Sequence, residues 1–201
     1  MTGPAPLART PAEALEQLKN GNQRFIDDRR EVGDLSIRRL ELAAGQNPFA
    51  VVLSCSDSRV PVETVFDQMP GNLFVVRIAG NFLDGNGLGT IEYGVDILKA
   101  TLVLVMGHTS CGALTAAVDY VRSGTVPPGH IGALVAALAP VAQRTNDGAA
   151  DWVDRAVAEN VRETVKAIAA RSVIVAQAVQ KGDTAVAGGV YDLPTGRVAF
   201  L

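Results

Sequence analysis

The sequence contains few of the residues that form disulfides, bind metals or stack as aromatic groups. Its 201 residues include two cysteines, two histidines and one tryptophan, and aromatic residues account for 5% of the chain. The low aromatic content indicates an interior filled by Ala, Val, Gly and Leu, as in tightly packed α/β proteins. A chain of this length can bury a sizeable core without disulfides. We therefore expect a single domain that comprises residues 1–201.

A strong net charge and long apolar runs are also absent. The formal net charge of −3 argues against non-specific binding to nucleic acid. No apolar run approaches the roughly 20 residues of a membrane span, so no membrane partner is expected. The first residues show no basic segment followed by an apolar core, and hence no secretory signal. We expect a cytoplasmic protein, in which two cysteines serve as metal ligands or catalytic groups instead of forming a disulfide.

Short Val-rich apolar runs alternate with segments of helical periodicity, which predicts buried strands separated by helices. The expected fold class is α/β, with a central, mostly parallel β-sheet of four strands plus a C-terminal edge strand, and helices on both faces. A Gly- and Asn-rich loop is expected at residues 81–89. The expected strands are 49–55, 73–78, 102–107, 184–191 and 197–201, and the expected helices are 11–26, 35–44, 62–67, 90–99, 111–124, 130–144 and 151–181.

Residues 10–45 precede the first strand and are expected to form an N-terminal helical arm. The arm begins with Thr-Pro-Ala-Glu at residues 10–13, which places an N-cap, a first-turn proline and a third-position glutamate in order. The helix is expected to be interrupted near Gly21. Residues 1–9 are expected to be disordered, because two prolines there break any regular element. An apolar helix ahead of the first strand must pack on something, for example a second subunit.

Two apolar runs end in residues that bind metals. Residues 51–54 are followed by Cys55, and residues 102–107 are followed by His108-Thr-Ser-Cys111. The carboxyl ends of parallel strands are where such sheets form ligand sites. Two cysteines and one histidine form a zinc ligand set that leaves a fourth position for water or substrate, as in catalytic sites. Either cysteine alone is better explained as a core residue, whereas all three residues at strand ends favour the zinc site.

Asp57 and Arg59 follow the first cysteine closely, and two roles are open for them. Asp57 either takes the fourth zinc position in a closed form, or pairs with Arg59 and accepts a hydrogen bond from a hydroxide on the zinc. Arg59 would keep the carboxylate ionised and orient it. The simplest alternative is a solvated surface ion pair, which contributes little.

The two motifs, taken in this order, resemble those of the β-class carbonic anhydrases. The first is Cys55-Ser-Asp57-Ser-Arg59 and the second is His108-Thr-Ser-Cys111-Gly112. The resemblance extends from about Leu18 to the end of the chain. Further stretches that match are 77–81, 91–93 and 188–192.

This resemblance implies reversible hydration of carbon dioxide to bicarbonate and a proton. Zinc would make hydroxide available near neutral pH, and hydroxide would attack the carbon atom. Asp57 and Arg59 would be the catalytic pair. The resemblance places Gln46, Phe74 and Tyr93 in the substrate pocket, partly supplied by a neighbouring subunit, and has Gly112 offer a backbone N–H to the substrate. A homodimer or homotetramer is expected.

Two rival functions are considered. A hydrolase of carbonyl sulfide or carbon disulfide on the same scaffold would share the motifs and differ in pocket lining and access. A non-catalytic zinc or thiol regulatory protein would keep the fold, but a merely structural metal site does not need Asp57 and Arg59.

Overall fold

The computed structural model describes residues 8–31 and 35–201, and its centre is a five-stranded sheet in the order β2-β1-β3-β4-β5. The first four strands run parallel, and β5 pairs antiparallel with β4 at the edge. The expected fold class is therefore confirmed. The strands are β1 Ala50–Ser54, β2 Leu73–Arg77, β3 Leu102–His108, β4 Ala185–Tyr191 and β5 Val198–Phe200.

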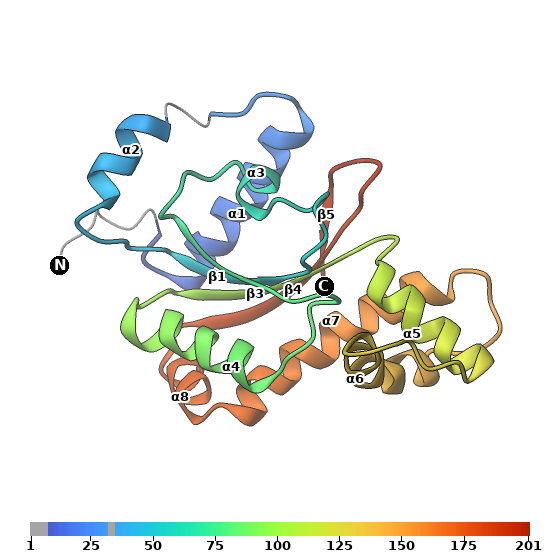
Figure 1. Ribbon diagram of the computed structural model, residues 1–201. Coiled ribbons are helices and arrows are strands. Elements are labelled where there is room, and N and C mark those ends of the chain that lie inside the picture. Colours follow the sequence, from blue (N-terminus) through green and yellow to red (C-terminus); the bar gives the residue numbers. More distant parts are fainter. Residues whose placement is uncertain (1–7, 32–34) are drawn as a thin grey trace.

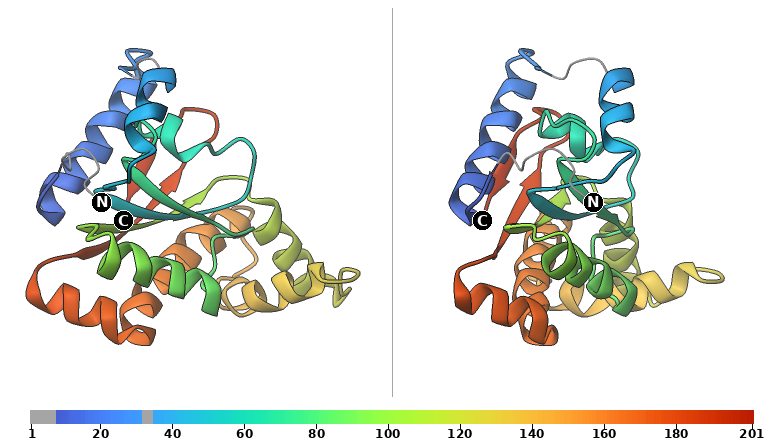
Figure 2. Two further views of the ribbon diagram at one scale, coloured as in Figure 1. Left: turned by 60° about the vertical axis from the view of Figure 1, so that its left-hand side comes forward. Right: turned by 90° about the vertical axis from the view of Figure 1, so that its left-hand side faces the viewer.

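Helices cover both faces of this sheet (Figures 1 and 2). The helices α1, α2 and α3 lie on one side, whereas α4, α7 and α8 lie on the other, and α5 and α6 pack beside one end of the sheet. Their bounds are α1 Pro11–Ile26, α2 Leu35–Leu42, α3 Val62–Val65, α4 Gly85–Glu92, α5 Gly112–Ser123, α6 Ile131–Arg144, α7 Trp152–Arg171 and α8 Val173–Lys181, with a π-helix η1 at Tyr93–Ile97. Within the described part of the chain, none of the helices has both the length and the apolar character needed to cross a membrane.

The continuous apolar sequence of β1 is explained by its burial on both faces of the sheet. Ala50 and Val52 face the core that α1 and α3 cover, while Val51 and Leu53 face the core under α4 and α7. All of these side chains are fully buried. Since successive side chains in a strand point to opposite faces, a strand covered on both faces needs a continuous apolar run.

Helix α4 begins earlier than expected. The loop expected at residues 81–89 gives way to α4 at Gly85. The side chain of Asp84 accepts a hydrogen bond from the Gly87 N–H at 2.6 Å and so caps the helix. The glycine-rich run is thus the first turn of a helix. The remainder of the expected helix at 90–99 continues as η1, whose wider turn contains Tyr93.

The expected continuous helix at residues 151–181 is divided at Ser172. The Ser172 hydroxyl accepts a hydrogen bond from the Val175 N–H at 3.1 Å and so caps α8. It also donates to Glu92 Oε1 at 2.6 Å, which ties the break to α4. Helical periodicity continues across the break because both α7 and α8 bury a face against the same side of the sheet.

Helix α1 starts as the sequence predicts, with a capping box between Thr10 and Glu13. The expected interruption near Gly21 is wrong, since the helix is continuous to Ile26. The glycine instead allows close packing, because a Cβ atom there would lie 1.8 Å from the carbonyl oxygen of Phe66. Of the expected disordered segment 1–9, residues 1–7 lie outside the described residues, and Ala8 is buried.

Asn22 joins the helical arm to the rest of the domain. Its buried Nδ2 donates to the carbonyl oxygens of Val65 at 3.1 Å and Gly196 at 2.8 Å, and its Oδ1 accepts from the Val198 N–H at 2.9 Å. Replacing Asn22 with alanine leaves these buried groups without partners. We expect Asn22→Ala to lower the free energy of unfolding by about 3 kcal/mol, measured by urea denaturation.

Asn20 provides the matched control, because it lies exposed on the same helix. The change Asn20→Ala should alter the free energy of unfolding by no more than about 0.5 kcal/mol. Equal losses in the two variants would show that the hydrogen bonds of Asn22 do not hold the arm.

Candidate metal and active site

Three metal-binding side chains meet at the carboxyl ends of β1 and β3. Cys55 directly follows β1, His108 is the last residue of β3, and Cys111 is the N-cap of α5. These strands are parallel neighbours, so their ends reach the same edge of the sheet. One ligand atom from each of the three residues lies within 4.8 Å of the others, and all three residues are buried. The residues that the sequence singled out as ligands are therefore brought together.

The imidazole of His108 is oriented as a metal ligand requires. Its Nδ1 lies 3.0 Å from the carbonyl oxygen of Thr109. A carbonyl oxygen only accepts hydrogen bonds, so Nδ1 carries the hydrogen and Nε2 carries the lone pair. Nε2 is buried and has no hydrogen-bond partner among the described residues. A cation at this position would satisfy Nε2, and a Cys₂His set suits zinc.

The charges of the two thiols also favour a cation. The pKa of Cys55 is lowered to about 4, chiefly by its pairing with the Cys111 thiol and in part by the backbone N–H groups of Gly80 and Asp57. The same pairing, together with burial, raises the pKa of Cys111, because a second thiolate would repel the first. Burial alone would lower the pKa of His108, but the negative charge of the neighbouring Cys55 raises it. A divalent ion among these atoms would remove the repulsion between two thiolates.

Asp57 and Arg59 form a two-pronged ion pair beside the cluster. Arg59 donates from Nε to Oδ1 at 2.9 Å and from Nη2 to Oδ2 at 2.7 Å, and its backbone N–H adds a bond to Oδ1 at 2.9 Å. These bonds hold the pKa of Asp57 well below its usual range. Oδ2 of Asp57 lies 3.9 Å from Nε2 of His108. The Asp57 side chain is 17% exposed, so this pair differs from a fully solvated surface pair.

Helix α5 begins at the cluster and contributes backbone donors. The backbone N–H groups of Ala113 and Leu114 act to lower the pKa of Cys111, against the larger effects of Cys55 and burial. Gly112 is the first residue of the helix, where N–H groups have no intrahelical partner. The start of α5 thus places Gly112 directly beside a candidate ligand.

The other expected pocket residues lie at the opposite end of β1. Phe74 pairs in register with Val51, and its ring lies 5.9 Å from that of Tyr93. Gln46 and Tyr93 line a cavity of about 850 Å³. Val51 and Cys55 are four positions apart along the strand, a distance of about 13 Å. Gln46, Phe74 and Tyr93 are therefore grouped with one another and separated from the metal cluster of their own chain.

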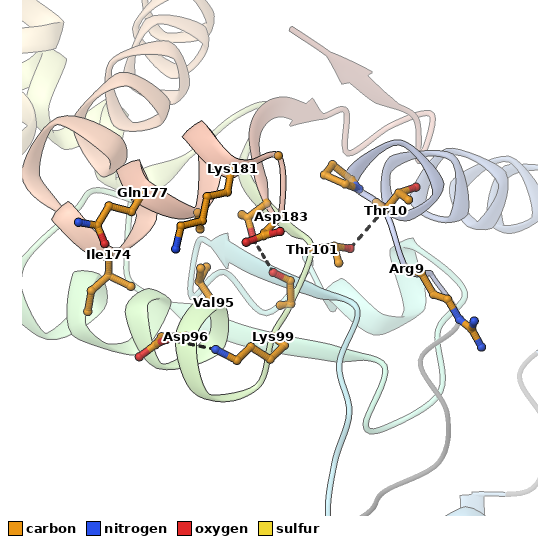
Figure 3. A pocket seen from close by; sticks show the side chains of 15 residues that line it. Arg9, Thr10, Val95, Asp96, Lys99, Thr101, Ile174, Gln177, Lys181 and Asp183 are labelled. Atoms are coloured by element: carbon orange, nitrogen blue, oxygen red, sulfur yellow. Dashed lines mark hydrogen bonds and ion pairs between the residues drawn. The ribbon is translucent and has the colours of Figure 1, made fainter.

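A further cavity, of about 550 Å³, lies at the amino ends of β3 and β4 (Figure 3). Thr101, Asp183 and the ion pair of Lys99 with Asp96 line it. None of the expected site residues is among the residues that line it. Its lining mixes both charges and is remote from the Cys–His–Cys cluster.

Comparison with known proteins agrees with this geometry. The family model described as carbonic anhydrase matches residues 50–198. The chain belongs to the carbonic anhydrase family. Carbonic anhydrase 2 of Mycobacterium tuberculosis is 40% identical over 191 residues, which cover 94% of this chain and 92% of that protein. A carbonic anhydrase of Mycolicibacterium smegmatis is 40% identical over 189 residues, with the same coverage.

Solved structures identify the chain as a β-class carbonic anhydrase. The Coccomyxa β-carbonic anhydrase in complex with acetazolamide superposes with a TM-score of 0.74 at 30% identity, covering 93% of this chain and 86% of that one. A tetrameric β-carbonic anhydrase of Sordaria macrospora gives a TM-score of 0.73 at 27% identity, and the superposition covers 81% of this chain and 85% of that one.

Arg77, which begins the matching stretch 77–81, was not expected among the catalytic, substrate-binding or metal-binding residues. It lies at the carboxyl end of β2, next to β1, and donates from Nε to the Cys55 carbonyl at 3.0 Å and from Nη2 to the Asp57 carbonyl at 2.5 Å. Arg77 thereby holds the backbone that carries a candidate ligand and the candidate catalytic carboxylate. The match at residues 77–81 and the place of this arginine at the end of a strand are the signals in the sequence for this contact.

Proposed function

We propose that this carbonic anhydrase catalyses the reversible hydration of carbon dioxide at Cys55, His108 and Cys111, with zinc as its metal. The observation that carries the proposal is the meeting of three ligand atoms within 4.8 Å of one another, beside a carboxylate held by Arg59. When bound there, zinc lowers the pKa of a water molecule and so supplies the nucleophile near neutral pH.

In this proposal, Asp57 acts as the hydrogen-bond acceptor that orients the nucleophile. Both of its carboxylate oxygens are already engaged by the Arg59 guanidinium, which keeps the group ionised. An ionised carboxylate accepts hydrogen bonds only, so it turns the hydrogen of the nucleophile towards itself and a lone pair towards the carbon atom. If Asp57 were a fourth metal ligand, metal binding would compete with its two hydrogen bonds to the Arg59 guanidinium. The pairing with Arg59 therefore favours the orienting role.

We propose that the substrate pocket is completed by a second copy of the chain. Phe74 lies level with Val51, about 13 Å along β1 from Cys55, and Tyr93 contacts Phe74 and shares a cavity with Gln46. Tyr93 and Ile97 are large apolar side chains that remain exposed on η1. The solved Sordaria relatives are tetrameric. A homodimer, alone or within a tetramer, would bring these residues to the metal site of the partner, where the Gly112 N–H would hold a substrate oxygen.

A mixing experiment tests this arrangement. Cys55→Ser removes a ligand, and Gln46→Ala removes a pocket residue. If Gln46 acts across the interface, a mixed dimer contains one intact site, formed by the metal cluster of the Gln46→Ala chain and the Gln46 of the Cys55→Ser chain. Co-refolded chains should therefore hydrate carbon dioxide faster, per metal cluster, than Gln46→Ala alone.

If Gln46 acts within its own chain, each mixed dimer contains only defective sites, and the rate per metal cluster stays at that of Gln46→Ala. Mixing the wild-type chain with Cys55→Ser is the control, because it should leave the rate per intact cluster unchanged in either case.

The substrate is tested on one preparation. Carbon dioxide hydration is followed by stopped flow, and release of sulfide from carbonyl sulfide and carbon disulfide is followed beside it. We expect fast hydration and no comparable release of sulfide. Zinc measured by atomic absorption should approach one ion per chain.

We also propose a cytoplasmic location. Cys55 and Cys111 are both free thiols, and a reducing compartment keeps thiols available as metal ligands. Cell fractionation with an antibody to the chain tests the location directly.

A further inference from the structure

Asn160 is a buried polar residue that is distant from both motifs in the sequence. It belongs to α7 and is 6% exposed. Its Nδ2 donates to the carbonyl oxygen of Gly80 at 2.9 Å. The N–H of the same glycine donates to Cys55 Sγ at 3.3 Å. A single residue therefore links the Asn160 amide to the sulfur of a candidate metal ligand.

The turn that contains Gly80 explains why its N–H faces the sulfur. The turn spans residues 78–81 and is closed by a hydrogen bond from the Asn81 N–H to the Ile78 carbonyl at 2.8 Å. Gly80 occupies the third position with a φ of +78°, which is typical of a type II turn. A type I turn would rotate the preceding peptide and point the Gly80 N–H away from Cys55.

Packing makes this position specific for glycine. A Cβ atom on Gly80 would lie 2.6 Å from Leu138 Cδ1 and 3.1 Å from the Cβ of Ala113. Its positive φ is also costly for any residue with a side chain. The hydrogen bond from Asn160 fixes the peptide that follows Gly80, so both peptides around its Cα are held.

We propose that Asn160 is a positioning residue of the metal site, which holds the Gly80 N–H on the Cys55 sulfur. This inference rests on the proposed function, because it takes Cys55 to be a ligand. A hydrogen bond to a thiolate draws negative charge away from the sulfur and makes it a weaker donor to the metal. Asn160 thereby adjusts how much negative charge the Cys55 sulfur donates to the ion. It does so although its helix, α7, carries none of the three candidate ligands.

Cobalt(II) substitution tests the proposal, because thiolate ligands give cobalt a charge-transfer band that reports the charge on sulfur. In Asn160→Ala the sulfur should become a stronger donor, and the band should move to longer wavelength than in the wild-type protein. The dissociation constant for cobalt should nevertheless rise roughly tenfold, because the sulfur is no longer held in place, as for the loss of other groups that support a ligand. Asn160→Leu, which keeps the volume but has no donor, should show the same shift. So should Gly80→Ala, which disfavours the turn.

Asn22→Ala is the matched control, since it removes another buried asparagine that holds backbone groups but makes no hydrogen bond to a candidate ligand or to Gly80. It should lose stability without moving the cobalt band. An unchanged band in both Asn160 variants would overturn the proposal, as would an equal shift in Asn22→Ala. Absence of a thiolate band in the wild-type protein would instead contradict the proposed ligand set, which keeps the two failures distinct.

Discussion

Replacing Cys55 with serine should lower kcat/KM for carbon dioxide hydration by on the order of a thousand-fold or more, because the metal contributes several kcal/mol of transition-state stabilisation. Serine keeps the shape of the side chain, but its hydroxyl does not ionise at neutral pH and is a poor zinc ligand. His108 and Cys111 alone would leave the ion with two protein ligands. We therefore expect the bound zinc per chain to fall together with the rate, measured by atomic absorption and stopped flow.

Ser56→Ala provides the matched control for this change. Ser56 is the exposed neighbour of Cys55, and its loss should leave zinc content and activity near those of the wild-type protein. Urea denaturation of Cys55→Ser in the presence of a chelator, compared with the wild-type protein treated in the same way, separates metal loss from misfolding. Full activity and a full complement of zinc in Cys55→Ser would contradict the proposed ligand set.

Replacing Asp57 with asparagine should lower the hydration rate by about 100-fold or more while zinc remains bound. The carboxylate lies 3.9 Å from Nε2 of His108 and accepts three hydrogen bonds from Arg59. The amide of asparagine has the same size but carries no charge, and it presents a hydrogen-bond donor in place of one acceptor. It therefore no longer directs the hydrogen of the nucleophile towards itself in a single orientation. Stopped-flow hydration assays and zinc analysis on the same preparation measure the two quantities.

Arg59→Lys separates the charge of this pair from its geometry. Lysine keeps the positive charge but loses the planar fork that binds both carboxylate oxygens. We expect an intermediate loss of about tenfold, because the carboxylate stays ionised but is less well held. If Asp57 mainly closes the site as a fourth ligand, Asp57→Asn should be as active as the wild-type enzyme or more active, and the orienting role would be wrong.

Local chemistry accounts for what could be predicted from the sequence. The expected strand at 102–107 is found at Leu102–His108, because a strand buried on both faces requires a continuous apolar run. The start of α1 was predicted from Thr10 and Glu13, whose capping box involves only neighbouring residues. The convergence of Cys55 with His108 also followed from local patterns, since both were expected at carboxyl ends of parallel strands.

A local cap within a glycine-rich run and a contact between distant segments account for what the sequence did not predict. The early start of α4 depends on Asp84, a cap that a glycine-rich run conceals. The break at Ser172 depends on its bond to Glu92, a residue 80 positions away. Periodicity reports only which face of a helix is buried, and both sides of the break bury the same face.

The sequence by itself determined the fold class, the family and the candidate ligands, because apolar periodicity and two short motifs are properties of neighbouring residues. Only the tertiary structure decided which groups support those ligands. It placed Arg77 on the Cys55 backbone and Asn160 on Gly80. It also placed Phe74 at the far end of β1 from Cys55, because strand register and direction arise when strands from separate parts of the chain pair.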